Sequence, residues 1–246
     1  MPRIFCPTEL HVASVLDLPE RAVKHVQVLR LQPGSELVVF NGKGGEYEAT
    51  VLEMGRQSVR VRVHAYHDIE RENTQAVHLM VGMPANERMD WLVEKATELG
   101  VQRITPLMTQ RSVLKLSGER GLKKTQHWQH IAIGACEQCG RNRVPVIDEP
   151  LSLAQLLQAL PLASQRLVLS TQVSPSRSNA TPSIGTESAL KFEDITQVLS
   201  GPEGGLDPRE EEALINKGFM PWSLGQRILR AETAALYALM SLTAHR

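Results

Sequence analysis

The chain has 246 residues, 42% of them hydrophobic, and its 27 basic and 27 acidic residues leave a formal net charge of zero. This length holds one large domain or two smaller ones, with enough apolar residues for a core. No run reaches the roughly 18 apolar residues of a membrane span, and the first residues lack the apolar stretch of a secretory signal. Three cysteines, an odd number, favour a reducing compartment over a disulfide framework. We therefore expect a cytoplasmic protein with no membrane partner.

Residues 1–72 predict a small β-rich unit with one early helix. Apolar residues at helical spacing place that helix over 18–29. Segments with the composition or alternation of strands follow it at 36–40, 46–52 and 58–63. The glycine-rich stretch 41–45 lies between the first two of these and is typical of a hairpin. The charged segment 68–73 is expected to be a linker.

From residue 76 onward, apolar strands alternate with helices. Strands are expected at 77–83, 103–108, 144–147, 166–170, 195–200 and 219–223. Helices are expected at 86–100, 152–160, 208–217 and the end of the chain. A longer helix is expected after the strand at 103–108, ending at about residue 139. This alternation is typical of a parallel sheet covered on both faces. Residues 171–189 are rich in Ser, Thr, Pro, Asn and Gly, and predict a mobile surface loop.

Basic residues concentrate between 103 and 144. This stretch has eight Lys or Arg residues against two acidic ones, a local excess of six in a chain that is neutral overall. Such a cluster is what binding to a polyanion requires, because Lys and Arg release counterions from phosphates. A solvated helix face that happens to be basic is the alternative.

The long helix predicted to end near 139 carries two histidines and two cysteines, which invite comparison with a zinc site. On one helix, His127 and Cys136 point about 180° apart at 100° per residue, so one ion cannot be held by all four side chains. We therefore expect the cysteines to be core residues and the protein to need no metal. The other face of this helix is polar, and it is either a solvent-exposed surface or part of a functional site. Its residues are His130, Gly134, Glu137, Gln138 and Arg141.

Two segments in the last third of the chain are the most informative. Ser200-Gly201-Pro202-Glu203-Gly204-Gly205-Leu206 follows an apolar run, and Leu224-Gly225-Gln226-Arg227-Ile228-Leu229-Arg230-Ala231-Glu232-Thr233-Ala234 precedes an alanine-rich helix. Glycines in such loops let the backbone approach a ligand. A phosphate loop would continue with Lys and then Ser or Thr, so a nucleoside without phosphates fits better. The alternative for the first segment is a simple turn before a helix that Asp207 and Glu210 cap.

The pairing of these two segments is similar to the ribosomal RNA small-subunit methyltransferase E family of the SPOUT class, and the resemblance extends over the whole chain. Further shared segments are 94–100, Arg111-Ser112, Glu137-Gln138-x-x-Arg141, His25-x-x-Val28-Leu29-Arg30 and 41–46. The resemblance implies an α/β fold with a PUA-like RNA-binding β-barrel over 1–72. It also implies a SPOUT methyltransferase domain over 73–246, with a parallel sheet and a trefoil knot.

The same resemblance implies the activity: S-adenosylmethionine-dependent methylation of ring nitrogen N3 of one uridine in 16S ribosomal RNA, by a homodimer. Either naked RNA or a 30S particle fits as the substrate. Expected contacts to the methyl donor are Leu169, Ser170, Thr171, Gly201, Pro202, Glu203, Gly204, Leu224, Gly225, Ile228, Leu229 and Arg230. Expected RNA contacts are Arg3, His25, Arg30, Arg111, Lys123, Lys124, Gln138 and Arg141.

The chemistry of uridine N3 suggests which residues are catalytic. N3 carries a proton and is a poor nucleophile until that proton leaves. Arg230 is our first candidate for stabilising the resulting negative charge on the base, because it is a permanent cation beside the expected donor loop. Glu137 or Glu232 is expected to accept the proton, although Glu232 also suits the first turn of a helix without any catalytic role.

Two other functions are compatible with the sequence. One is a SPOUT-class methyltransferase with another RNA target, and the other is a noncatalytic RNA-binding module with a remnant ligand loop. Dimerisation is expected because the terminal helix is apolar over most of its surface, although a helix buried within one chain has the same pattern.

Overall fold

The computed structural model describes residues 1–171 and 195–244, so the loop expected at 171–189 lies outside the described residues except for Thr171. The chain forms two compact units. Unit 1 comprises Met1–Glu72 and Ile133–Val144, and unit 2 comprises Asn73–Ala132 and Pro145–Arg246. Helix α3 (Gly118–Cys139) therefore contributes residues to both units.

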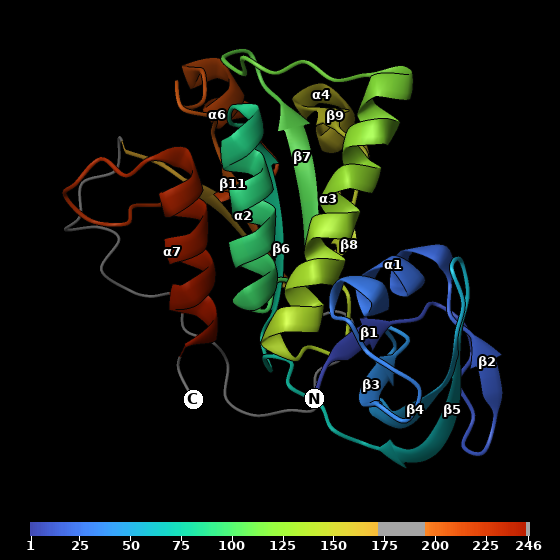
Figure 1. Ribbon diagram of the computed structural model, residues 1–246. Helices are drawn as coiled ribbons and strands as arrows, with labels where there is room; N and C mark the ends of the chain where they lie inside the picture. The colour runs from blue at the N-terminus through green and yellow to red at the C-terminus, as the bar shows by residue number, and fades with distance from the viewer. Residues whose placement is uncertain (172–194, 245–246) are drawn as a thin grey trace. The chain divides into compact units, whose positions relative to one another are not determined.

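Unit 1 is built on a five-stranded sheet with the order β1-β3-β4-β5-β2 (Figure 1). The strands are β1 (Arg3–Phe5), β2 (Val15–Asp17), β3 (Glu36–Phe40), β4 (Glu46–Met54) and β5 (Val59–His67). Strand β1 pairs in parallel with β3, and the other pairs are antiparallel. Helix α1 (Glu20–Val28) buries Ala22, Val23 and Val26 in the core of this unit.

The hairpin expected at 41–45 is confirmed, since it joins the antiparallel strands β3 and β4. Its three glycines all have positive φ, a conformation that side chains disfavour. Strand β5 alternates buried and exposed residues over its first part, as its sequence predicts. Short strands β1 and β2 were not predicted, because three residues are too few to establish a period.

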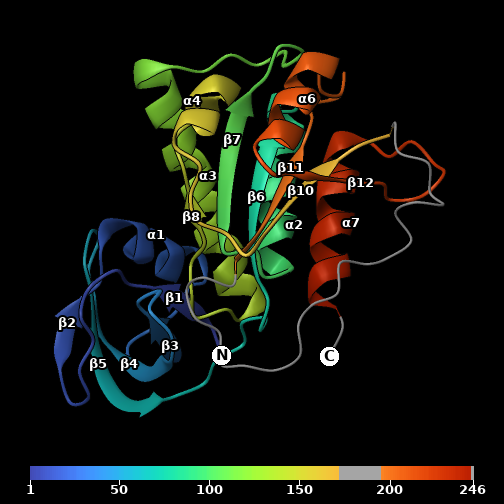
Figure 2. The ribbon, with the colours of Figure 1, turned by 180° about the vertical axis from the view of Figure 1, so that it is seen from behind.

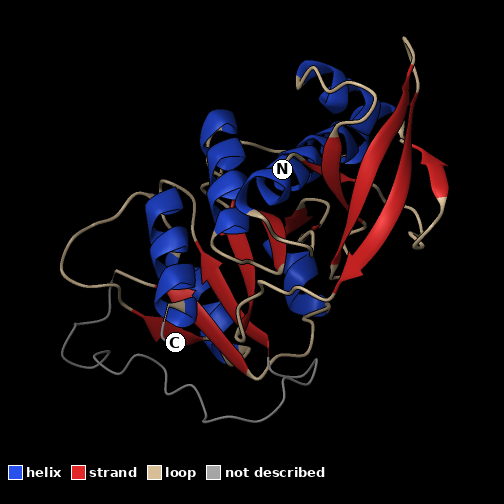
Figure 3. Cartoon of the chain, turned by 60° about the horizontal axis from the view of Figure 1, so that its bottom comes forward, coloured by secondary structure: helices blue, strands red, loops and turns tan. Residues whose placement is uncertain are grey.

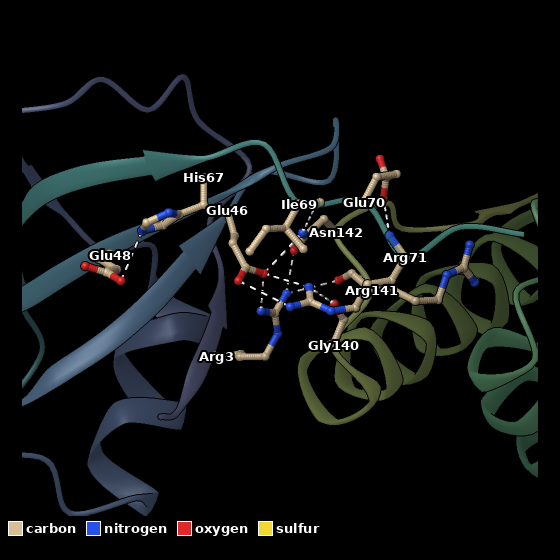
Figure 4. Close-up of polar contacts among 10 residues, drawn as sticks. All are labelled: Arg3, Glu46, Glu48, His67, Ile69, Glu70, Arg71, Gly140, Arg141 and Asn142. Atoms are coloured by element: carbon tan, nitrogen blue, oxygen red, sulfur yellow. Dashed lines mark hydrogen bonds and ion pairs between the residues drawn. The ribbon is translucent and has the colours of Figure 1, made fainter.

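The charged segment 68–73, expected to be a linker, contains the boundary between the two units at Glu72 and Asn73, and its charged residues form ion pairs within unit 1. Glu70 pairs with Arg143, and Glu72 with the buried Arg141. Arg71 donates to Glu46 and to the Gly140 carbonyl (Figure 4). The partners of Glu70 and Glu72 lie about 70 residues away in the sequence, so the sequence alone did not indicate these ion pairs.

Glu46 is the centre of this network, and its side chain is only 10% exposed. It accepts hydrogen bonds from Arg3 at 2.7 Å, Arg71 at 2.8 Å and Asn142 at 3.2 Å (Figure 4). Burial alone would raise the pKa of this carboxyl, but the hydrogen bonds from Arg71, Arg3 and Asn142 outweigh burial and lower the pKa to about 2. In the folded protein the Glu46 carboxylate therefore stays charged at pH values well below those at which a glutamate is ordinarily protonated.

We expect Glu46→Gln to lower the free energy of unfolding by about 3 kcal/mol at neutral pH, since it leaves the largely buried Arg3 and the adjacent Arg71 without the charge of their partner. The folded pKa lies below the unfolded value, so this contribution is complete above pH 4.5 and is lost as the pH falls toward 2. Urea unfolding of parent and variant should therefore converge in acid. Glu48→Gln, at a half-exposed carboxylate paired with His67, is the control and should change little. Equal stability of Glu46→Gln and parent at neutral pH would contradict this role.

Unit 2 contains a seven-stranded sheet in which β12-β10-β11-β6-β7-β8 is the main order and β9 also pairs with β7. Figure 3 draws the strands in red and the helices in blue. The strands are β6 (Ala76–Gly82), β7 (Arg103–Met108), β8 (Val146–Ile147), β9 (Leu151–Ser152), β10 (Gln165–Leu169), β11 (Ile195–Ser200) and β12 (Met220–Trp222). All of their pairings are parallel, as the alternation of strands and helices predicted.

Helices cover both faces of this sheet. Helices α2 (Asn86–Glu98) and α7 (Ala231–Thr243) pack with α3 on one face, where Trp128 and Leu239 join the core (Figure 1). Helices α4 (Leu153–Gln158) and α6 (Pro208–Asn216) cover the other face, where Leu156 and Leu214 pack on the strands (Figure 2). The central strands β6 and β11 are thus buried on both faces, whereas the edge strands β8 and β12 keep exposed residues.

Local signals place several helix boundaries correctly. The capping box expected before α6 is confirmed, with Asp207 and Glu210 each bonding the other's backbone.

Helix α3 carries all four residues of the apparent zinc motif, and Cys136 is buried, which raises the pKa of its thiol to about 12. Within 1–171 and 195–244, no group of three or more His, Cys, Asp and Glu side chains is arranged to hold a metal. In the same residues, no helix is long and apolar enough to cross a membrane.

Candidate functional site

A cavity of about 530 Å³ lies in unit 2, where β10, β11 and β12 end. Three chain segments line it, 169–171 after β10, 200–206 after β11 and 222–231 after β12. These three strands are neighbours in the sheet (Figure 2), so the segments that leave their carboxyl ends meet at one edge. This edge is where open parallel sheets bind ligands.

The twelve residues expected to contact the methyl donor all line this one cavity. They come from three parts of the sequence: Leu169, Ser170, Thr171, Gly201, Pro202, Glu203, Gly204, Leu224, Gly225, Ile228, Leu229 and Arg230. The structure adds residues that the sequence did not single out as contacts, among them Arg88, Ser200 and Glu211. Arg88 lies on an ordinary amphipathic helix far from the glycine motifs, so no local signal marks it.

Close backbone approach explains the glycines of the first loop. A Cβ atom on Gly201 would lie 2.8 Å from the Leu206 nitrogen and 2.9 Å from the Gly205 carbonyl carbon. A Cβ on Gly82, at the end of β6, would lie 2.6 Å from Pro202. The loop is therefore folded tightly on itself and on the neighbouring strand, which leaves its backbone no room for larger residues.

Two side chains fasten this loop to other elements. Glu203 accepts a hydrogen bond from the Ala85 N–H at 3.0 Å and lies 3.4 Å from Arg88, which connects the loop to the start of α2. Arg111 donates to the Gly204 carbonyl at 2.9 Å and lies 3.6 Å from Asp207. Arg111 was expected to contact RNA, and the structure places it against the glycine loop, where it also lines the cavity.

Arg230 lines the cavity at the N-cap of α7 and is exposed. No acidic side chain among the described residues pairs with it. A cation at a helix N-terminus faces the positive end of the helix dipole, so this position is unfavourable for the fold alone. Placements that oppose local preference are typical of functional sites.

Glu232, two residues further on, is 7% exposed. Its Oε1 lies 4.0 Å from Arg88 Nε, and its Oε2 is buried with no hydrogen-bond partner in the described part of the chain. The hydroxyl of Ser200, which lines the cavity, is in the same situation. Buried polar atoms without partners are rare in proteins, and a bound ligand is one explanation for them.

The other candidate residues lie elsewhere. Glu137, with Arg3, His25 and Gln138, lines a second cavity in unit 1 and does not line the first. Arg141 was expected on a polar helix face, but it is 4% exposed and paired with Glu72, because it is packed inside unit 1. Lys123 and Lys124 lie in the unit 2 part of α3, where Lys123 is exposed and pairs with Glu119, and Arg30 is exposed with φ 54°.

A parallel α/β sheet with a glycine-lined cavity at its carboxyl edge defines the class of α/β proteins that bind a small ligand there. The sequence profile of a family described as RNA methyltransferase domain matches residues 71–243. The profile of the RNA methyltransferase PUA domain matches residues 18–63. The chain belongs to the RNA methyltransferases and, among them, to the ribosomal RNA small subunit methyltransferase E family.

Individual relatives agree over nearly the full length. The ribosomal RNA small subunit methyltransferase E of Bacillus subtilis is 30% identical over 96% of this chain and 92% of its own. The Neisseria gonorrhoeae enzyme of that name, solved with bound S-adenosylmethionine, is 31% identical, with a TM-score of 0.88 over 99% of this chain and 97% of its own. A Legionella pneumophila structure with the same bound cofactor is 36% identical, with a TM-score of 0.88 over 98% and 96%.

Proposed function

We propose that this protein transfers the methyl group of S-adenosylmethionine to ring nitrogen N3 of one uridine in 16S ribosomal RNA. The RNA class and the methyl donor follow from family membership and from the two relatives that have S-adenosylmethionine bound. The choice of uridine N3 is what the resemblance of the sequence motifs to the family implies. We also propose a cytoplasmic location, because ribosomal RNA is the substrate.

The observation that carries this proposal is the cavity at the ends of β10, β11 and β12. Its volume of about 530 Å³ is within the range of small-molecule sites. Leu169, Leu224 and Leu229 provide apolar walls, while the glycine loop presents backbone groups. The Ser200 hydroxyl, which has no partner among the described residues, is a polar group that a bound nucleoside would satisfy. These features fit an uncharged adenosine moiety better than a phosphate.

The bound donor supplies a methyl group on a sulfonium centre; as N3 bonds to that carbon, the carbon–sulfur bond breaks and its electron pair stays on sulfur. The protein's part is to hold the base in line and to manage the N3 proton. Arg230 is proposed to stabilise negative charge on the uracil oxygens. Glu232 is the better placed of the two candidate proton acceptors, because it adjoins the cavity wall and one of its oxygens has no partner in the described chain. Both oxygens of Glu137 are occupied in unit 1.

Mass spectrometry of 16S ribosomal RNA from cells with and without this protein tests the function directly. We expect one 3-methyluridine to disappear when the protein is absent and to return with the purified protein, S-adenosylmethionine and either naked RNA or 30S particles. Comparison of the last two substrates identifies the form that is methylated. A lost methyl group on a ribose or on another base would replace the N3 assignment.

We also propose a homodimer that uses the outer surface of α2 and α7. Most apolar residues of α7 are buried within unit 2, but Tyr237 and Met240 remain 53% and 47% exposed, and Trp91 on α2 is 46% exposed. Large apolar side chains on two packed helices favour a second copy as the partner. We expect Trp91→Glu with Tyr237→Glu to give a monomer by light scattering. Leu162→Glu, at an equally apolar and 84% exposed site, should leave the dimer intact. A monomeric parent protein at micromolar concentration would contradict the proposal.

A further inference from the structure

The second cavity, also of about 530 Å³, lies within unit 1 and has no part in the proposed methyl transfer. It brings together segments that are more than 100 residues apart in sequence. Its lining residues are Met1, Pro2, Arg3, Arg21, His25, Leu29, Gly134, Glu137 and Gln138. Basic side chains outnumber acidic ones three to one in this lining, with Glu137 as the single acid.

Glu137 organises the basic residues of the cavity. Its side chain is 5% exposed, and its Oε1 accepts the Phe5 N–H at 3.0 Å, which anchors it to β1. Its Oε2 lies 3.4 Å from Arg21 Nη2 and 3.2 Å from His25 Nδ1, both on α1. The carboxylate is therefore fully engaged inside the protein, and it holds the Arg21 guanidinium and the His25 imidazole, both partly exposed, at the cavity.

Further features make this cavity suited to an anionic ligand with an apolar part. Arg3 uses both of its terminal nitrogens on Glu46 and Asn142, and its buried Nε–H has no acceptor among the residues described. Pro2 and Leu29 contribute apolar surface. Gly134 lies inside helix α3, where glycine costs about 1 kcal/mol relative to alanine, and its missing side chain leaves the wall beside Arg21 open.

From this arrangement we propose that the unit 1 cavity is a nucleotide subsite for the substrate RNA, in which Arg21 and His25 bind a backbone phosphate and Pro2 and Leu29 contact the attached nucleoside. Glu137 is a positioning residue for Arg21 and His25. This subsite rests on the proposed RNA substrate and adds a discrete binding position to it. An arginine and an imidazole held by a buried carboxylate form a fixed donor pair for phosphate oxygens.

Single substitutions test the subsite through binding of a single-stranded oligouridylate, measured by fluorescence anisotropy over a range of salt concentrations. We expect Arg21→Gln and His25→Gln each to weaken binding about 10-fold and to reduce the salt slope by about 0.7 for each phosphate that the protein no longer neutralises. Arg56→Gln, at an exposed arginine of unit 1 outside the cavity, is the matched control and should bind like the parent. Parent-like binding and slope in both cavity variants would overturn the proposal.

Gly134→Gln separates the subsite from a purely structural cluster. This change keeps every charge and improves helix propensity, but its side chain enters the space beside Arg21. We expect an unchanged or higher Tm together with about 10-fold weaker RNA binding, and a raised KM for RNA with an unchanged kcat at saturation. Normal RNA affinity with the cavity filled would refute the subsite.

The unmodified protein offers a second measurement that does not depend on variants. Uridine 5′-monophosphate is expected to shift the ring resonances of His25 in NMR spectra more strongly than inorganic phosphate does, because it also contacts Pro2 and Leu29. No shift with either compound would overturn the subsite. Calorimetry with S-adenosylmethionine distinguishes failure of the proposed function from failure of the subsite. Absent binding of S-adenosylmethionine contradicts the proposed function, whereas the subsite is tested by RNA binding without the donor.

Discussion

Replacement of Arg230 by alanine is expected to lower kcat by about 100- to 1,000-fold, the usual effect of removing one donor that stabilises developing negative charge. Arg230 lines the cavity proposed to hold the methyl donor, at the N-cap of α7, and no acid among the described residues neutralises it. Removing a cation from a helix N-terminus should not destabilise the fold. Single-turnover methylation of 16S ribosomal RNA, with donor and RNA both saturating, measures this loss.

The controls for Arg230→Ala address charge and position. Arg230→Lys keeps the charge and should recover part of the rate, though not all of it, because an ammonium group lacks the planar fork of a guanidinium. Arg209→Ala removes an exposed arginine of α6 that does not line the cavity, and it should methylate at the parental rate. If Arg230→Ala has the parental kcat while its fold is intact, the charge-stabilising role is excluded.

Gly201→Ala is expected to weaken S-adenosylmethionine binding about 100-fold, equivalent to about 2.7 kcal/mol. The added Cβ would meet the Leu206 nitrogen at 2.8 Å and the Gly205 carbonyl carbon at 2.9 Å. These are backbone atoms, which cannot rotate away as a flexible side chain can. The glycine loop must therefore shift, and the backbone groups that line the cavity shift with it. Isothermal titration calorimetry with S-adenosylmethionine measures the change in Kd.

Gly218→Ala is the matched control for this prediction. Gly218 follows α6 and has a φ of +86°, so alanine is strained there, but nothing lies within 4 Å of the new atom and the residue does not line the cavity. Gly218→Ala should reduce the free energy of unfolding by about 1 kcal/mol, which lowers the Tm, and leave the Kd for S-adenosylmethionine unchanged. Parent-like donor affinity in Gly201→Ala would show that the loop geometry does not determine binding.

Much of unit 2 could be predicted because its signals are local. Strand β6 is a short apolar run, and α6 begins at a capping box that four consecutive residues define. The loop after β11 was predictable for the same reason, since it is one continuous segment with three glycines. Arg88 was missed because it reaches the cavity from α2, and helix periodicity carries no information on which exposed residue meets a distant loop.

By itself, the sequence determined the α/β class, the positions of the main strands and helices, and the loop segments that meet at the cavity of unit 2, because backbone propensity and short motifs act over a few residues. Only the tertiary structure decided the roles of polar residues whose partners are distant in the sequence. Glu137 had the pattern of a polar helix face, yet contacts with β1 and α1 bury it and make it the anchor of a second cavity. A buried carboxylate requires partners, and partners more than 100 residues away are specified only by the folded chain.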